Sequence, residues 1–123
     1  MQNNRKKGNE YEERAVSLLQ EKAYHILARN FRTSIGEIDV IAEKDDILVF
    51  VEVKYRKNRK FGYGKEAVNS QKLLRIFRVA EYYRSHCTKP YQKMRIDVIH
   101  FLGDTYFWDQ DVAWGDEIGC EMF

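Results

Sequence analysis

The chain has 123 residues, of which 44% are hydrophobic and 33% charged, and its formal net charge is +2. This length suits one domain, 1–123, with a single buried core. No apolar run approaches the ~20 residues of a membrane span, and the polar, basic start is not a secretory signal. Cys87 and Cys120 lie far apart, which favours two free thiols in a reducing cytoplasm.

The charge is unevenly distributed along the chain. All 21 Lys and Arg lie in residues 1–95 with 12 of the 19 acids, whereas residues 96–123 hold seven acids and no Lys or Arg. A basic body with an acidic end is typical of a protein that binds a polyanion, although ordinary surface charge explains it equally well. The role of the acidic C-terminal extension, residues 103–123, stays open. The oligomeric state also stays open, with a homodimer among the alternatives.

Hydrophobic periodicity predicts the first elements. Residues 1–7 are expected to be frayed, and residues 8–22 to form an amphipathic helix. Glu12 lies beside the apolar stripe of that helix. It is either a surface acid of the kind favoured near a helix start or an acid that leans over the sheet. Residues 25–32 predict a first strand, and residues 33–36 the turn that follows it.

The next segment, residues 36–56, reads GEIDVIAEKDDILVFVEVKYR and predicts a hairpin that turns at Asp45-Asp46. In this register the numbers of cross-strand partners sum to 91, so Asp39 faces Glu52. Side chains alternate between the two faces of a strand, so the apolar residues share the opposite face. Their expected pairs are Ile38 with Val53, Val40 with Val51, and Ala42 with Val49. A slip of one residue would destroy both patterns.

The hairpin brings two carboxylates together among Val, Ile, Leu and Phe. Directly opposed Cβ atoms lie roughly 4.5–5.5 Å apart, so Asp39 and Glu52 repel unless a cation lies between them. Carboxylate oxygens suit Mg²⁺ or Mn²⁺, and the spacing of the histidines predicts no zinc site. Lys54 would lie on the same face, with Glu37 opposite it. The alternative is a salt bridge on a solvated strand edge.

A basic loop and a second helix follow the hairpin. The loop, residues 55–65, is either a solvated connector or a flap that contacts phosphates. Asn69 or Ser70 can cap a helix that runs to about His86. A row of cations three residues apart lies on this helix, as a solvated face or as a contact for a nucleic-acid backbone. These cations are Lys72, Arg75 and Arg78.

Two strands complete the expected domain. Residues 94–102 form one, in which we expect Asp97 to have a structural role, and residues 105–108 can return as an edge strand. The strands on either side of the second helix can lie parallel through a right-handed crossover. The prediction is an α/β sandwich of order αβββαβ, possessing a mixed central sheet with the Glu52 strand at its centre.

These motifs resemble the restriction-endonuclease-like superfamily, whose signature of an acid, a hairpin and acid-x-Lys is matched by Asp39, Glu52 and Lys54. More closely, residues 8–102 resemble the YraN family of small bacterial proteins with that fold. The matches are Gly8, Glu12, Ala15, ARNFR at 28–32, GEID at 36–39, FVEVKYR at 50–56, Phe61-Gly62, Val68, Lys72 and RIDVI at 95–99. The family usually has Gly where Ala23 stands, so the first helix is expected to end without its left-handed glycine cap.

The resemblance, which extends to archaeal Holliday-junction resolvases, implies a restriction-endonuclease-like three-layer sandwich. It also implies a cytoplasmic nuclease that uses Mg²⁺ or Mn²⁺ to cleave DNA phosphodiester bonds, with a preference for branched or damaged DNA. No membrane and no small-molecule cofactor are expected. The alternatives are a non-catalytic nucleic-acid-binding accessory protein with the same fold, and an interaction module whose acidic tail contacts a protein.

The resemblance also implies roles for particular residues. The metal ligands would be Glu12, Asp39, Glu52 and the backbone carbonyl of Val53. Lys54 would orient the nucleophile or offset charge on the phosphate, and Glu37 would hold Lys54 or the turn before it. Contacts with nucleic acid are expected from Arg32, Arg56, Lys57, Lys72 and Arg75.

Overall fold

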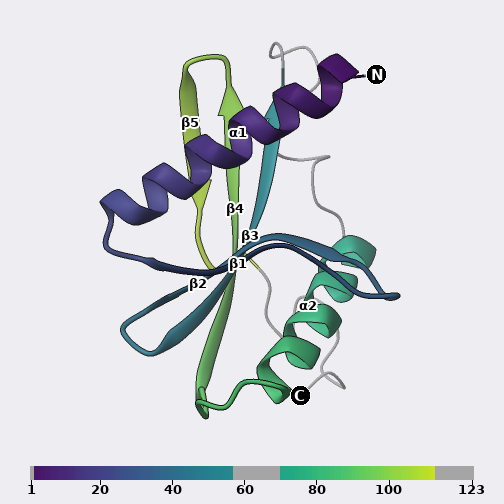
Figure 1. Ribbon diagram of the computed structural model, residues 1–123, viewed down its shortest axis with the longest axis vertical. Helices are drawn as coiled ribbons and strands as arrows, with labels where there is room; N and C mark the ends of the chain where they lie inside the picture. Colours follow the sequence, from purple (N-terminus) through teal and green to yellow (C-terminus); the bar gives the residue numbers. More distant parts are fainter. Residues whose placement is uncertain (1, 57–69, 113–123) are drawn as a thin grey trace.

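A five-stranded sheet with one helix on each face forms the protein, as seen in a computed structural model that describes residues 2–56 and 70–112 (Figure 1). The elements in chain order are α1 (Gln2–Glu21), β1 (His25–Arg32), β2 (Glu37–Lys44), β3 (Ile47–Arg56), α2 (Ser70–Ser85), β4 (Lys93–Leu102) and β5 (Thr105–Asp109). The predicted element order is therefore confirmed, including the edge strand at the end.

The sheet is mixed, and its strand order follows the chain from β1 to β5. β3 and β4 are parallel, whereas the other neighbours are antiparallel. Parallel neighbours need a long crossover connection, and the connection here contains α2. β3 is the central strand, as its nearly continuous apolar run predicts.

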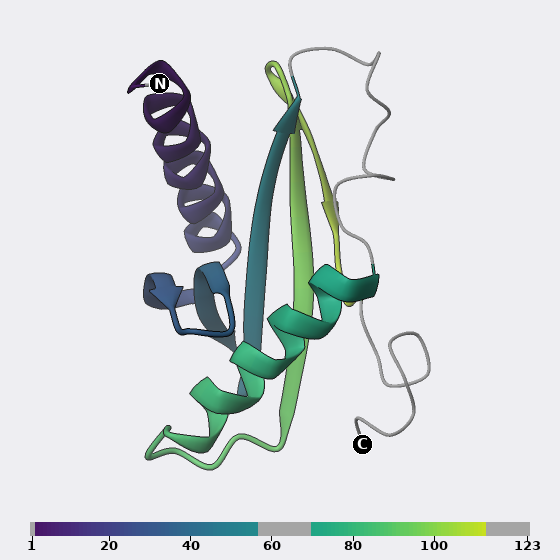
Figure 2. The same cartoon turned by 90° about the vertical axis from the view of Figure 1, so that its right-hand side faces the viewer.

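Two separate cores lie on the two faces of the sheet. One core packs Ala15, Val16 and Leu19 of α1 against the sheet, and the other does the same with Ile76 and Phe77 of α2. Figure 2 shows α1 to the left of the long strands and α2 crossing in front of their lower part. This arrangement agrees with the predicted layered α/β fold. Neither helix offers the long apolar stretch that a membrane crossing requires within the described residues.

The first helix is longer than predicted at its start. It begins at Gln2 instead of Gly8, and the expectation that residues 1–7 are frayed stays a prediction. No proline interrupts this stretch, and a single interior glycine costs only about 1 kcal/mol. At the other end, Ala23 itself adopts a left-handed conformation with φ of 70°. The amide of Tyr24 donates to the carbonyl of Leu19 at 2.9 Å, which closes the helix as glycine usually would.

The hairpin turn is confirmed at Asp45 and Asp46. Both have positive φ, 53° and 64°, as a two-residue turn of the primed type requires. Aspartate tolerates this conformation better than most residues. From this turn the expected register holds as far as the pair Val40–Val51.

Asp97 of β4 has the structural role predicted for it. Its side chain is fully buried and accepts hydrogen bonds from Arg95 at 2.9 and 3.0 Å. The indole of Trp108 and the backbone amide of Asp111 also donate to it, at 2.9 and 3.0 Å. These bonds attach β5 and the residues after it to the sheet.

Candidate functional site

The candidate site lies where β2 separates from β3. The ladder between these strands ends at the pair Val40–Val51. Beyond it, Asp39 Oδ2 accepts a hydrogen bond from the backbone amide of Val53 at 2.8 Å. The predicted pair of Ile38 and Val53 is wrong, because Ile38 belongs to the core beneath α2 whereas Val53 packs on the α1 side.

The separation coincides with a change of face in the neighbouring strand pair. Arg29 of β1 forms an ion pair with Glu13 of α1 at 2.8 Å, yet Phe31 packs on Tyr83 of α2. Residues two apart in a regular strand share a face, so the chain turns over between them. The residue between them, Asn30, is left-handed with φ of 51°.

β2 turns over at the matching position. Arg29 pairs with Val40 and Phe31 pairs with Ile38, so Asn30 lies opposite Asp39. Val40 packs on the α1 side and Ile38 on the α2 side. The paired strands therefore rotate together at Asn30 and Asp39. This rotation takes Asp39 out of the β2–β3 ladder.

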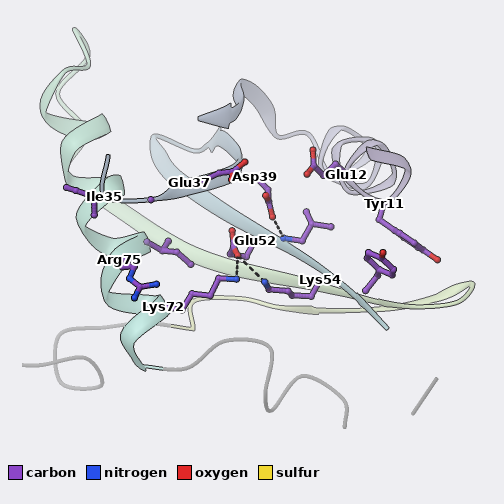
Figure 3. Close-up of a pocket in the computed structure, with 13 residues that line it drawn as sticks. Tyr11, Glu12, Ile35, Glu37, Asp39, Glu52, Lys54, Lys72 and Arg75 are labelled. Carbon is purple, nitrogen blue, oxygen red and sulfur yellow. Dashed lines mark hydrogen bonds and ion pairs between the residues drawn. The ribbon is translucent and has the colours of Figure 1, made fainter. Parts of the chain in front are cut away.

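A pocket of about 490 Å³ occupies this position. Its walls come from both helices, the start of β2 and the end of β3, as Figure 3 shows. The lining residues are Tyr11, Glu12, Ile35, Gly36, Glu37, Asp39, Glu52, Val53, Lys54, Tyr55, Lys72, Arg75 and Ile76. The pocket thus brings together Glu12, Asp39, Glu52 and Lys54, the residues that the sequence predicts for catalysis.

Glu52 is the most enclosed of the acids that line the pocket. Its side chain is only 6% exposed, and its Oε2 atom lies 3.1 Å from Lys72 Nζ and 3.5 Å from Lys54 Nζ. Figure 3 shows both lysines directed at this carboxylate, one from β3 and the other from α2. The ammonium groups supply the opposite charge that a buried carboxylate needs.

Glu12 reaches the pocket from α1. Its Oε1 atom is buried and has no hydrogen-bond partner within the described part of the chain. A buried polar oxygen without a partner is costly, and such groups are rare in folded proteins. The sequence left Glu12 either as a surface acid or as an acid that leans over the sheet, and the structure supports the second.

Neighbouring acids disfavour the ionisation of Asp39. The pKa of Asp39 is raised to about 7, mainly by burial and then by the nearby charges of Glu52 and Glu12, against the hydrogen bond from Val53. The carboxyl of Asp39 is therefore a proton acceptor near neutral pH. A cation in the pocket would oppose this shift.

The two lysines are shifted in opposite directions. Burial lowers the pKa of Lys54, and contact with Lys72 lowers it further. Burial also disfavours the charged form of Lys72, but its contacts with Lys54 and Glu52 raise its pKa overall. Neighbouring groups with opposed shifts are typical of acid–base sites. Lys72 is the more firmly charged member of the pair.

The other predicted residues are placed as follows. Glu37 lines the pocket, but its carboxylate pairs with Arg32 at 3.2 Å and so supports the strand next to the turn. The predicted opposition of Glu37 and Lys54 is wrong, because the β2–β3 ladder has already ended and Lys54 pairs with Glu52. Arg56 donates to the carbonyl of Tyr55 at 3.2 Å. Lys57 lies outside the described residues.

Two features of the pocket were not identified from the sequence. Tyr11 and Tyr55 stack at one end, with ring centroids 4.7 Å apart and planes 15° from parallel. Lys72, assigned to nucleic-acid contact, is also a direct partner of Glu52. The predicted topology could have indicated this contact, because a crossover helix that follows β3 begins beside the end of that strand.

The carboxylates are the groups that could hold a metal. As they stand, no three His, Cys, Asp or Glu side chains among the described residues are close enough together to coordinate one. Glu12, Asp39 and Glu52 nevertheless line one pocket with Val53. Oxygen ligands of this kind suit a hard divalent cation.

Known proteins resemble this chain over most of its length. The model of the Uncharacterised protein family UPF0102 matches residues 11–101. A UPF0102 protein of Fusobacterium nucleatum subsp. nucleatum is 48% identical over 119 residues, covering 95% of this chain and 98% of the relative. UPF0102 proteins of Caldicellulosiruptor saccharolyticus and Clostridioides difficile are 44% and 45% identical over 97 residues. Each alignment covers 79% of this chain, and 82% and 85% of the respective relatives. The chain therefore belongs to the UPF0102 family, in agreement with the YraN-family resemblance.

Proposed function

We propose that this protein is a metal-dependent nuclease that hydrolyses DNA phosphodiester bonds with a restriction-endonuclease-like site. The observation that carries the proposal is the meeting of Glu12, Asp39, Glu52 and Lys54 in one pocket. These residues come from one helix and two strands, so the fold is what gathers them. A structural cluster would have its polar atoms satisfied, whereas a buried oxygen of Glu12 has no partner in the described part of the chain.

The residues present fit a divalent cation such as Mg²⁺ or Mn²⁺. The carboxylates of Asp39 and Glu52 would hold it, with Glu12 and the carbonyl of Val53 as further oxygen donors. The unpartnered Glu12 oxygen supports this fit, and so does the raised pKa of Asp39, caused by burial and by neighbouring acids. When bound, such an ion activates water and offsets phosphate charge.

The chain's own cations would position and stabilise the phosphate. Lys54 lies in the pocket, where it can orient the attacking water or donate to the phosphate as its charge develops. Arg75 lines the same pocket, and Arg32 and Arg78 are exposed. Contacts from such residues to the backbone provide affinity with little reading of sequence. The preference for branched or damaged DNA rests on the resemblance to resolvases alone.

The test is a cleavage screen of the full chain with Mg²⁺ or Mn²⁺ on duplex, flap, junction and single-stranded DNA. We expect cleavage that needs the metal and falls by about 100-fold or more in Asp39→Asn and Lys54→Ala. Glu13→Gln is the matched control, because Glu13 follows Glu12 but pairs with Arg29 outside the pocket. The proposal fails if no DNA form is cleaved, or if both pocket variants cleave as well as the parent.

One observation favours a second function, that of a non-catalytic nucleic-acid-binding accessory protein. Glu52 already has two ammonium groups within 3.5 Å, so its charge is balanced without a metal. This function predicts salt-sensitive DNA binding that needs no divalent cation. The same screen separates the two functions, because the accessory protein would bind DNA and cleave none of its forms.

A further inference from the structure

Lys72 occupies the space next to Glu52 that a metal ion would need. Its Nζ atom lies 3.1 Å from Glu52 Oε2, closer than Lys54 Nζ at 3.5 Å. Both ammonium groups contact the same carboxylate oxygen, so they also repel each other. A divalent cation bound at Glu52 would add a third positive centre in this space. If the ion coordinates Oε2, the oxygen that both ammonium groups contact, at least one lysine has to move away.

We propose that the Lys72 ammonium is an internal counter-ion which a divalent cation displaces from Glu52, and that the displaced ammonium then binds a phosphate of the nucleic acid. The inference deepens the proposed nuclease function and rests on it. It gives Lys72 two successive partners, the carboxylate without the metal and the phosphate with it.

The structure indicates why Lys72 moves and Lys54 stays. The Lys72 side chain is 37% exposed and that of Lys54 is 21% exposed. Lys54 lies two residues after Glu52 on β3, so their side chains share a face of the strand. Lys72 instead comes from the first turn of α2. Its four-carbon stem can turn towards the open side of the pocket without any movement of the sheet.

The exchange couples metal binding to nucleic-acid binding. Without nucleic acid, the metal must compete with Lys72 for Glu52, so its affinity is reduced. With a phosphate nearby, the displaced ammonium gains a new partner. Each ligand then strengthens the binding of the other by the same factor, as linkage requires. The pocket would therefore bind its metal tightly only when the substrate is present.

Competition of this kind gives Lys72→Gln two effects of opposite sign. Removing the ammonium leaves Lys54 as the single lysine at Glu52, so Mn²⁺ should bind about 10-fold more tightly in the absence of DNA. Removing it also deletes a phosphate contact, so DNA should bind more weakly in Ca²⁺. A lysine that only contacted DNA would produce the second effect alone. A purely structural lysine would weaken the binding of both ligands.

Arg75→Gln is the matched charge control. Arg75 lines the same pocket and lies one turn further along α2, but it is not among the partners of Glu52 in the described part of the chain. Its removal lowers the positive charge by the same amount without freeing that carboxylate. We expect its Mn²⁺ affinity to change by about 2-fold or less. Lys72→Arg, which keeps the charge, should not tighten Mn²⁺ binding.

The experiment titrates the full-length protein with Mn²⁺, measuring free Mn²⁺ by electron paramagnetic resonance, and separately measures binding of a labelled DNA duplex in Ca²⁺. Circular dichroism confirms that each variant is folded. Tighter Mn²⁺ binding by Lys72→Gln than by Arg75→Gln, with weaker DNA binding, supports the exchange. Equal or weaker Mn²⁺ binding by Lys72→Gln overturns it, as does the absence of Mn²⁺ binding in parent and variant.

The outcome is separate from that of the nuclease proposal. A parent that cleaves no DNA, with a Lys72→Gln variant that binds Mn²⁺ more tightly, would refute the nuclease and keep the exchange as a binding device. A parent that cleaves DNA, with unchanged Mn²⁺ affinity in the variant, would support the nuclease and refute the exchange.

Discussion

Asp97 and the acids of the pocket differ in the groups that neutralise or hydrogen-bond their carboxylates. Asp97 accepts hydrogen bonds from the Arg95 guanidinium, the Trp108 indole and the Asp111 amide, so both of its oxygens have partners. In the pocket, one buried oxygen of Glu12 has no partner among the described residues, and Glu52 pairs with the ends of two flexible lysines.

The difference distinguishes a carboxylate that the fold holds rigidly from one whose partners can move. Two of the donors at Asp97, the Trp108 indole and the Asp111 backbone amide, are rigid groups, and the Arg95 guanidinium is itself held by a hydrogen bond to the Tyr24 hydroxyl at 2.6 Å. At Glu52 they come from long side chains that can move away. An acid whose support can be exchanged is able to accept a new cation. Buried acids are therefore better compared by the rigidity of their donors than by their burial.

The largest expected change in stability comes from a substitution at Asp97. Asp97→Asn removes the charge that balances Arg95, and its amide cannot accept every bond that Asp97 accepts. Breaking a buried ion pair from one side costs about 3 kcal/mol or more. Chemical denaturation at pH 7 measures the loss. A loss below about 1 kcal/mol would show that the two groups of acids do not differ in this way.

Replacing an acid in the pocket is expected to raise the stability of the protein, whereas replacing Asp97 lowers it. The folded pKa of Asp39 is about 7, raised by burial and by Glu52, against 3.8 for the ordinary group. The folded state therefore binds this proton more tightly, and stability falls as pH rises from about 4 to about 7. Asp39→Asn removes this penalty, so it should be more stable than the parent at pH 8 by on the order of 2 kcal/mol.

Thermal denaturation across pH checks this prediction. The advantage of Asp39→Asn should grow between pH 4 and pH 7, level off above pH 7 and disappear below pH 4. Mg²⁺ at pH 8 should reduce it, because a bound cation stabilises the charged carboxylate of the parent only. An advantage that is independent of pH would contradict the assigned cause.

Substitutions at Asn30, where β1 changes face, should have a smaller effect on stability. Asn30→Val places a β-branched residue at φ of 51° and should cost about 1–2 kcal/mol. Asn30→Gly tolerates this φ and should be nearly neutral. If the rotation positions Asp39, the valine variant should also shift the pKa of Asp39, measured by carboxyl-carbon NMR, while the glycine variant should not. Equal pKa values of Asp39 in both variants would show that the conformation of Asn30 does not position Asp39.

The smallest effect tests a position away from both groups of acids. Ala23 is left-handed with φ of 70°, where alanine is strained and glycine is not. Ala23→Gly should therefore stabilise the protein by about 0.5–1 kcal/mol. The gain should be the same at pH 5 and pH 8 and with or without Mg²⁺. Loss of stability in a thermal melt would mean that the greater freedom of glycine in the unfolded chain outweighs the relief of strain.

Local patterns predicted the elements of the fold well. The alternation around Asp45 and Asp46 predicted the hairpin and its register to Val40, because turn chemistry and burial agree there. The prediction failed at Ile38, where counting by alternation assumes a regular strand. The rotation involves the positive φ of Asn30 on a different strand, which the pattern of β2 does not show. The end of α1 was predicted to lack its usual glycine, but the sequence did not show that Ala23 would take the left-handed conformation in its place, with the closing bond to Leu19.

The pocket residues that lie on the hairpin were easier to predict than the approach of Lys72. Asp39, Glu52 and Lys54 come from one hairpin, so their approach depends on short-range pairing. Lys72 approaches through the packing of α2, which depends on the whole crossover. A sequence pattern within one hairpin carries no information about that distance, and this explains why the Glu52–Lys72 pair was missed.

The parallel pairing of β3 with β4 also has a consequence for the order of folding. Glu12, Asp39 and Glu52 all precede the crossover, whereas Lys72 follows β3 in the chain. A nascent chain that has emerged only as far as residue 56 holds these acids with Lys54 but without Lys72. Mutual repulsion must therefore oppose their approach until α2 docks. We expect the β2–β3 hairpin to form early, and the separated end that holds Asp39 to settle among the last parts of the molecule.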